Sequence, residues 1–322
     1  MTYSAGGLIQ ATDYNGFAST NASANVNDLW GAGSGDKGWG QSALATVSAG
    51  GTVTATQWAS LVNTIASMGS QTNTAITARV APVTGNTIQI LAALNTDLTN
   101  ITTNRNNAAA VGTQFTGWTG TNSKTAATSG ATWTITFTNT VTFASAAALR
   151  YFFNGGGLIK LDVSKTATGQ TGDPEWNDLA NTLCGDIYFS GVAASHTIAG
   201  TAYTGTTKIG GTGVPNTLST TTGAYALVAG AAATIIYKQF ADTAPYTSNF
   251  IQHSVALNAA STALTFTTLW SASDGDPISG GTAASGATPG TAPCTICTYF
   301  PPSSTYLTTA SWGTPTVAAT TA

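Results

Sequence analysis

Charged residues are scarce in this sequence, and their scarcity narrows the partners that the protein can have. Only 7% of the 322 residues are Asp, Glu, Lys or Arg, against roughly 25% in an average soluble domain. The nine Lys and Arg residues are spread from Lys37 to Lys238, and the net charge is −3. Such a distribution provides no basic patch that could neutralise the phosphates of a nucleic acid. We therefore expect no nucleic-acid partner.

Long apolar runs are missing as well. No run approaches the roughly 18 consecutive apolar residues of a transmembrane helix, so we expect no membrane insertion. The N-terminal segment Met-Thr-Tyr-Ser-Ala-Gly-Gly lacks the basic and apolar regions of a secretory signal peptide. We therefore expect no secretory signal.

Cysteine occurs only at Cys184, Cys294 and Cys297, and this odd number with a long gap does not form a disulfide framework. Cys294 and Cys297 have CxxC spacing, but a zinc site needs further Cys or His residues nearby. A redox CxxC should open a helix after a strand, whereas this one lies among prolines. His196 and His253 are distant in the sequence. We interpret the segment as a loop or short strand with two thiols, and whether they pair stays open.

Small and neutral polar residues fill most of the chain. Glycine accounts for 36 residues, and the hydrophobic share is 42%. A chain rich in Thr, Val, Tyr and Trp with abundant Gly is typical of β-rich proteins. Little net charge also leaves little colloidal repulsion between copies. Neutral surfaces of Thr, Ser and Asn therefore favour an extended assembly over a freely diffusing monomer.

The first 126 residues are predicted to form an irregular and helical N-terminal region. Residues 1 to about 40 are rich in Gly and Asn, a composition typical of turns, and they carry Trp30 and Trp39. We expect this segment to be an attachment arm that orders only against neighbouring subunits, because it is too poor in apolar residues to build its own core. The alternative is that both tryptophans pack on this chain's own core.

Two helices are expected within the same region. Apolar residues from Trp58 to Met68 follow one helical face, with Thr54 or Thr56 as the N-cap. A second helix carries a heptad-like pattern formed by Leu91, Leu94, Leu98 and Ile101. Such spacing predicts an intermolecular contact, with a trimer if the protein forms a fibre. The alternative is a plain amphipathic helix packed on its neighbour.

The sequence period changes to two near residue 130, which predicts a second, β-rich domain over residues 127–322. Residues 132–143 alternate apolar side chains with threonine, as a half-buried strand does. Further strands are expected at 158–163, 187–189, 233–240, 248–257 and 263–270. Short helices are expected after Ser145, ended in the left-handed conformation at Asn154-Gly155, and after Asp173-Pro174. Residues 274–322 are expected to be mostly loop.

These patterns together predict a β-rich α+β protein. We expect an antiparallel β-sandwich-like domain with short helices, preceded by the irregular and helical N-terminal arm.

The segment 149–157, with its flanking strands and the later helix that contains Trp176, resembles a family of tailed-bacteriophage virion structural proteins. These proteins are often described as tail-fibre-like. The glycine- and tryptophan-rich segment 30–40 also resembles the start of such proteins. Residues Ile135 to Val163 carry the core of the likeness, and Pro174 to Phe189 and Tyr246 to Leu257 extend it. The core contains the motif formed by Phe152, Phe153, Asn154, Gly155, Gly156 and Gly157. The resemblance implies assembly and no catalytic residues.

Residues that could carry chemistry are better explained by local structure. Asp173 and Glu175 are two positions apart at a helix start and point to different sides, so they do not make a glycosidase pair. Asp274 and Asp276 lack the remaining ligands and the closing Glu of a calcium loop. The glycines at 31–35 are not followed by the Lys-Ser/Thr pair of a phosphate loop. We therefore predict no catalytic residue, no cofactor and no metal.

Neither histidine accompanies a nucleophile or a metal-binding motif. His253 shares a predicted strand face with Ile251, Val255 and Leu257. We expect it to be a core histidine.

The sequence thus favours a non-enzymatic structural component of a tailed-bacteriophage virion that is tail- or fibre-associated and assembled in the host cytoplasm. Its expected partners are other virion proteins and copies of itself. One alternative is a head or neck decoration protein. Another is a fibre module that binds a host receptor or surface glycan through aromatic residues in 299–306 or 225–246. A capsule-degrading enzyme is a third class, but it would require clustered carboxylates and usually a repeating β-helix.

Overall fold

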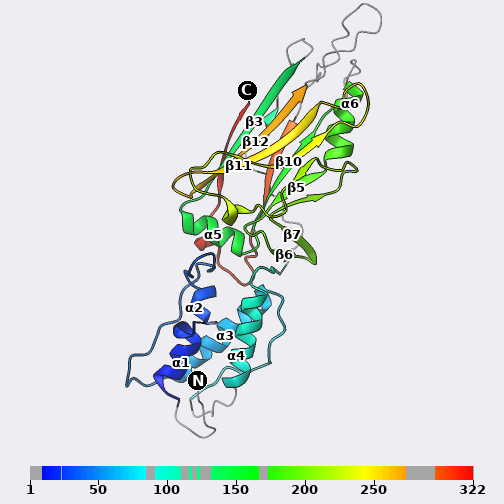
Figure 1. Cartoon of the computed structure of the whole chain (residues 1–322). Coiled ribbons are helices and arrows are strands. Elements are labelled where there is room, and N and C mark those ends of the chain that lie inside the picture. Colours follow the sequence, from blue (N-terminus) through cyan, green and yellow to red (C-terminus); the bar gives the residue numbers. More distant parts are fainter. Residues whose placement is uncertain are drawn as a thin grey trace, which may run out of the picture.

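The change of period near residue 130 coincides with the first long strand of a two-sheet structure. The computed structural model describes residues 9–22, 24–84, 91–109, 116–117, 122–123, 132–166, 173–272 and 294–321. Figure 1 shows an elongated molecule with helices α1 to α4 at one end and the sheets at the other. The prediction of a β-rich fold with antiparallel sheets and short helices is confirmed.

The first sheet, which we call the β3 sheet, has the strand order β14-β3-β12-β11-β10-β9. All its pairs are antiparallel. Its strands are β3 (Trp133–Thr142), β9 (Thr217–Leu218), β10 (Thr234–Phe240), β11 (Phe250–Leu257), β12 (Ala263–Ala272) and β14 (Thr316–Thr321). The strands expected in this sheet up to residue 270 are confirmed. Burial alternates along β3 as its sequence does, with the apolar residues inside.

The second sheet, the β4 sheet, has the order β1-β13-β4-β5-β8, and β2 also pairs with β13. Its strands are β1 (Thr116–Gly117), β2 (Asn122–Ser123), β4 (Leu158–Ser164), β5 (Asp186–Phe189), β8 (Thr206–Ile209) and β13 (Cys294–Phe300). A separate hairpin joins β6 (Ser195–Ile198) and β7 (Thr201–Thr204). Because β1 and β2 precede residue 127, the sheet begins earlier in the chain than predicted.

The C-terminal segment contains more regular structure than its composition predicts. Residues 274–322 were expected to be mostly loop, but β13 and β14 lie within them. Both strands pair along their whole length, β13 with β4 and β14 with β3. The prediction was wrong for these residues because distant partner strands supply hydrogen bonds that local Gly and Pro content does not reveal.

Aromatic side chains from both sheets meet in the core. The rings of Phe189 on β5 and Phe266 on β12 lie 5.3 Å apart and nearly perpendicular. Trp176 packs between Trp133 and Trp270, with ring centroids 4.8 Å and 5.6 Å away. Such aromatic pairs contribute beyond the area they bury. The two sheets therefore face each other as in a sandwich, with the helix that carries Trp176 packed into the core.

Two helices flank β4 in the sequence. The first, α5 (Ala146–Asn154), starts at Ser145, whose hydroxyl accepts a hydrogen bond from the Ala148 amide. The second, α6 (Asp173–Asp178), continues into a π-helical segment, η2 (Leu179–Cys184), which ends at Gly185 with φ 74°. The left-handed residue after α5 is Gly156, with φ 103°. Gly155 is right-handed, so the expected left-handed stop at Asn154-Gly155 comes later than predicted.

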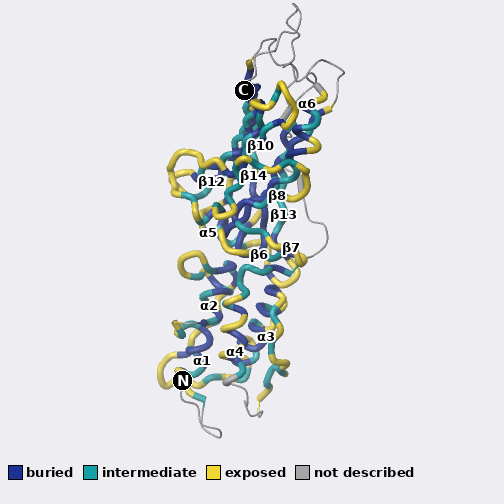
Figure 2. Tube along the Cα trace, turned by 45° about the vertical axis from the view of Figure 1, so that its right-hand side comes forward, coloured by how far each residue is buried: buried dark blue, intermediate teal, exposed yellow. Residues whose placement is uncertain are grey.

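The N-terminal region forms a helical cluster with its own buried residues (Figure 2). Its elements are α1 (Ala11–Asn15), the π-helical η1 (Gly16–Thr20), α2 (Val26–Leu29), α3 (Ala55–Gln71) and α4 (Leu91–Thr103). A capping box starts α3, because Thr54 and Gln57 satisfy each other's backbone amides. Short 3-10 helices follow in the second half of the chain, η3 (Ala224–Ala226) and η4 (Thr309–Ser311). Among the described helices, none combines the length and the hydropathy of a membrane-spanning segment.

Candidate functional site

The glycine- and tryptophan-rich segment 30–40 and the end of α5 pack against each other. Asn154, the last residue of α5, donates from Nδ2 to the carbonyl oxygens of Asp36 (2.7 Å) and Gly38 (2.9 Å). Its backbone oxygen accepts a bond of 3.0 Å from the Trp39 indole. Its Oδ1 accepts a bond of 2.9 Å from the hydroxyl of Tyr225. We call this contact between residues 31–41 and 150–157 the junction, since it joins the helical region to the sandwich.

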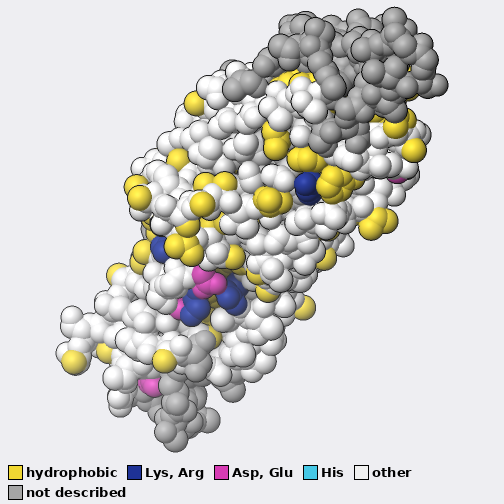
Figure 3. Space-filling model, turned by 45° about the horizontal axis from the view of Figure 1, so that its top comes forward, with side chains coloured by type: hydrophobic (Ala, Val, Ile, Leu, Met, Phe, Trp, Pro, Cys, Tyr) yellow, Lys and Arg dark blue, Asp and Glu magenta, His cyan; other side chains and the backbone are white. Residues whose placement is uncertain are grey.

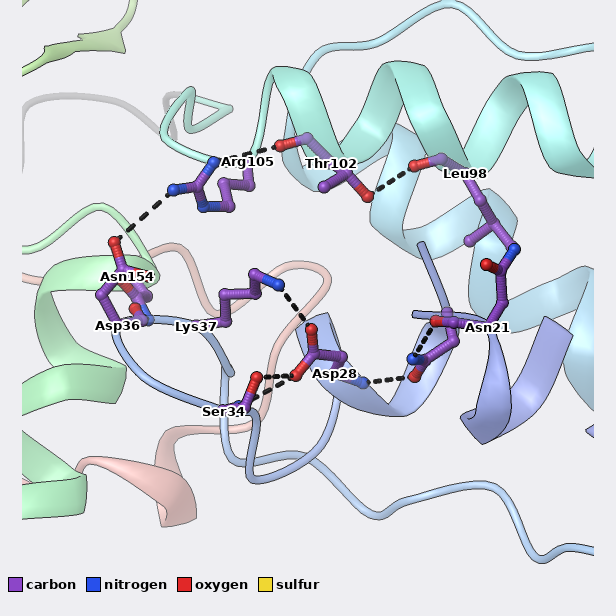
Figure 4. Close-up of polar contacts among 10 residues, drawn as sticks. Asn21, Asp28, Ser34, Asp36, Lys37, Leu98, Thr102, Arg105 and Asn154 are labelled. Atoms are coloured by element: carbon purple, nitrogen blue, oxygen red, sulfur yellow. Dashed lines mark hydrogen bonds and ion pairs between the residues drawn. The ribbon is translucent and has the colours of Figure 1, made fainter. Parts of the chain in front are cut away.

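Charged side chains stabilise the N-terminal side of the junction (Figure 4). Asp28 accepts hydrogen bonds from the amide and hydroxyl of Ser34 and pairs with Lys37 at 2.7 Å. Burial raises the pKa of the Asp28 carboxyl, but the bonds from Lys37 and Ser34 outweigh it, so that pKa lies below its ordinary value. Arg105 reaches Asp36 at 3.5 Å. These contacts fix the conformation of the glycine-rich loop formed by residues 31–40.

Arg150 of α5 holds the same loop from the sandwich side. Its guanidinium donates to the carbonyl oxygens of Ala32 (2.7 Å) and Gly35 (3.1 Å). Sequence reasoning missed Arg150 because a single arginine on a short helix carries no recognisable pattern. Figure 3 shows acidic and basic side chains gathered on one part of the displayed face, surrounded mostly by uncharged atoms.

Close approach of the helical region and the sandwich requires glycine at two positions. A Cβ atom on Gly156 would lie 2.5 Å from Cβ of Ala108 in the helical region. A Cβ atom on Gly40 would lie 2.3 Å from the ring of Tyr151. Both glycines have positive φ, which adds strain for any other residue. Glycine at these two positions therefore lets the backbone lie directly against a neighbouring side chain.

A second link also joins the N-terminal segment to the C-terminal part. The Gln41 side chain accepts a hydrogen bond of 2.8 Å from the Thr308 amide and donates one of 2.9 Å to the Ser311 hydroxyl. The Ser311 hydroxyl donates in turn to the Gly40 carbonyl at 2.7 Å. Because Gln41 and Thr308 are 267 positions apart, no sequence signal pointed to this contact.

The predicted attachment arm folds onto its own chain. Trp39 is 2% exposed, and the half-buried Trp30 packs edge-on against it at 6.4 Å. Tyr14 and Phe17 are buried against Trp58 of α3. This corrects the expectation that residues 1 to about 40 order only against neighbouring subunits, as far as that segment is described. The core of the chain, which composition alone does not reveal, covers these aromatic rings.

The heptad-like residues are internal as well. Leu94, Leu98 and Ile101 are at most 1% exposed and belong to the main core, and α4 packs against α3. Leu91 begins α4, and its side chain lies outside the described residues. The intermolecular role predicted for this pattern is therefore corrected in favour of the alternative, an amphipathic helix packed on its neighbour. Two heptads are too short to distinguish these cases from the sequence.

An extended neutral surface lies on the outer face of the β3 sheet. Threonines alternate with the buried residues along β3, and the register aligns them with hydroxyl residues on neighbouring strands. One row runs across four strands as Thr320, Thr138, Thr267 and Ser254. In the next row the hydroxyls of Thr140 and Thr265 are 3.3 Å apart.

We call this surface the threonine face. Its members are hydroxyl side chains that are half-buried or exposed, as on an open sheet face, namely Thr134, Thr136, Thr138, Thr140, Thr142, Ser254, Thr265, Thr267, Thr316 and Thr320. Lys238 on β10 is a neighbouring cation, and its ammonium lies 3.7 Å from the ring centre of Phe250. The surface therefore offers many hydrogen-bonding groups and little charge.

The aromatic segment 299–306, expected as a sugar-stacking region, borders a hollow of about 260 Å³. Tyr299, Pro301 and Trp312 line it together with Ser303 and other uncharged residues. Trp312 itself is buried, whereas Tyr299 is half-buried. Residues 225–246 are the other region expected to stack on sugars. There the Tyr225 hydroxyl donates a hydrogen bond to Asn154 at the junction.

The remaining titratable residues are dispersed. Glu175 is buried, and burial followed by the charges of Asp178 and Asp242 raises the pKa of its carboxyl. The side chain of Asp173 and both Asp274 and Asp276 lie outside the described residues. Within the described part of the chain, no group of three or more His, Cys, Asp or Glu residues could hold a metal ion.

Both histidines are core residues. His253 is fully buried, and its Nδ1 lies 2.8 Å from the Thr268 hydroxyl, as expected from its strand face. Burial lowers the pKa of His253 to about 3 and that of His196 to about 4. Both rings are therefore neutral at physiological pH.

The CxxC segment is a strand, as one of the two interpretations predicted. Cys294 is half-buried and Cys297 is buried on β13, and both are free thiols. Residues three apart on a strand point to opposite faces, which separates the two sulfur atoms.

No family model, curated protein or solved structure matches the chain. Its function is therefore inferred from the sequence motifs and from the geometry of the junction and the threonine face.

Proposed function

We propose that the protein is a structural component of a tailed-bacteriophage virion, tail- or fibre-associated, that acts through assembly contacts. The observation that carries the proposal is the threonine face, a broad sheet surface on strands β14, β3, β12 and β11, which contain no Asp, Glu, Lys or Arg. A surface with little charge suits a packed subunit better than a freely diffusing monomer, since it supplies little repulsion between copies. The family resemblance supports the same class.

The junction supports the proposal in a second way. Both segments that carry the resemblance contribute to it, with Asn154 on one side and Trp39 on the other. Their pairing gives a physical reason for the two motifs to occur in one chain. The proposed partners are other virion proteins and copies of this chain, and the proposed location is the virion. A head or neck decoration protein is the alternative within this class.

Gold-labelled antibody against the chain, imaged on purified particles by negative-stain electron microscopy, tests the proposal. We expect the label on the tail or its fibres. Label on the head or neck would support the decoration alternative. Absence of the chain from purified particles, measured by mass spectrometry of their proteins, would contradict a structural role.

A glycan-binding module is the second candidate, favoured by the neutral hollow beside Tyr299. Sugars bind through hydroxyl hydrogen bonds and contacts with aromatic rings. A glycan array probed with the purified chain tests this role. Binding that is lost on Tyr299→Ala but retained on Tyr306→Ala, a change outside the hollow, would support it.

A further inference from the structure

We propose that the threonine face packs against the same face of a second copy of this chain, related by a two-fold axis. The inference deepens the proposed function, on which it rests, by naming the partner of that surface. It also replaces the heptad of α4 as the self-association site, because the described heptad side chains are buried within the chain.

The size of the surface fits a stable pair. The strands β3 and β12 each have 10 residues, which corresponds to a length of about 33 Å. Four strands, β14 to β11, span about 19 Å at the usual spacing. Because β14 has only 6 residues and β11 has 8, a face-to-face pair would remove roughly 1,100 Å² from water, just above the area of about 1,000 Å² that a specific interface needs.

The chemistry of the surface is complementary to itself. A threonine hydroxyl both donates and accepts hydrogen bonds, so two rows of hydroxyls can satisfy each other in either direction. The bond between Thr140 and Thr265 shows that neighbouring hydroxyls of this face already pair within one copy. Threonine methyl groups and the half-buried Leu269 add apolar area. A sheet face also matches another sheet, since sheets stack about 10 Å apart.

Charge does not oppose the pair. Among the described residues of the β3 sheet, Lys238 is the cation beside the face, and it lies toward the β10 edge, opposite Gln252. In the proposed pair the two-fold axis lies between the two faces and runs parallel to β3, so it would place Lys238 near the β14 edge of the partner. That strand, Thr316–Thr321, contains no charged residue. The Lys238 ammonium would therefore not meet its own copy.

Sedimentation velocity of the full chain across micromolar concentrations tests the pair. We expect a concentration-dependent dimer for the wild type. Thr267 lies near the centre of the face, where a charge of either sign would approach its own copy. Thr267→Lys and Thr267→Glu should each sediment as monomers, and an equal mixture of the two should recover the dimer.

Matched controls use Thr201, an exposed threonine on the separate β6–β7 hairpin. Thr201→Lys and Thr201→Glu should leave the dimer unchanged, and circular dichroism should show that every variant keeps the wild-type fold. A monomeric wild type, dimers unaffected by either Thr267 change, or a mixture that stays monomeric would overturn the two-fold pair. If the purified chain is monomeric but the antibody still labels virions, this inference is contradicted while the proposed function stands.

Discussion

Asn154 shows how a single residue can join distant segments. Its side chain and carbonyl group contact the loop at 36–39 and the hydroxyl of Tyr225. A buried amide that uses both its oxygen and its nitrogen is costly to remove, because its partners lose hydrogen bonds without gaining water.

We expect Asn154→Ala to lower the free energy of unfolding by about 2–4 kcal/mol, because it leaves the carbonyls of Asp36 and Gly38 and the Tyr225 hydroxyl without this partner. Urea denaturation of the full chain measures the change. Tyr225→Phe, which removes one hydroxyl, is the matched control and should cost only about 1 kcal/mol. Equal losses in both variants would contradict the central place of Asn154.

At the scale of elements, the turn from α5 into β4 sets the distance between the two parts of the molecule. Gly156 has φ 103°, and its missing side chain leaves room for Ala108. The element therefore needs glycine both for its backbone conformation and for the close approach of the helical region.

Gly156→Ala should accordingly destabilise the protein by more than backbone strain alone, by roughly 2–4 kcal/mol. The matched control is Gly200→Ala, since Gly200 has φ 78° but no atom lies within 4 Å of the place that its Cβ would take. It should cost only about 1 kcal/mol. Thermal unfolding monitored by circular dichroism compares the two, and an equal loss would show that contact with Ala108 is unimportant.

For the whole molecule, two buried neutral histidines make stability depend on pH. An unfolded histidine has a pKa near 6.5, whereas burial lowers the pKa of His253 to about 3 and that of His196 to about 4. Between these values the unfolded chain binds more protons than the folded chain. The stability contributed by the neutral rings is therefore fully present above about pH 6.5 and falls as the pH drops toward the folded values.

We expect the free energy of unfolding to decline between neutral pH and about pH 5, with each histidine contributing up to about 1.4 kcal/mol per pH unit. His253→Gln should make this decline shallower, and the double variant with His196→Gln should make it shallower still. Urea denaturation at a series of pH values measures the slopes. Identical slopes in the wild type and the double variant would refute the role of the histidines.

Local pattern was enough to predict much of the sandwich. The alternation from Trp133 to Phe143, the Ser145 cap of α5 and the alternating residues of β11 each depend on neighbours in the sequence. Periodicity also showed which face of each strand is apolar, because side chains alternate across a sheet.

Contacts between distant residues were decided only by the tertiary structure. Trp39 and Asn154 are 115 positions apart, and nothing in either segment specifies the other. The same spacing of Leu94, Leu98 and Ile101 serves an internal helix and a coiled coil equally well, because periodicity defines an apolar face but not what covers it. The sequence by itself therefore determined the elements and their inner faces. The fold decided which surfaces were buried within the chain and left the threonine face outside.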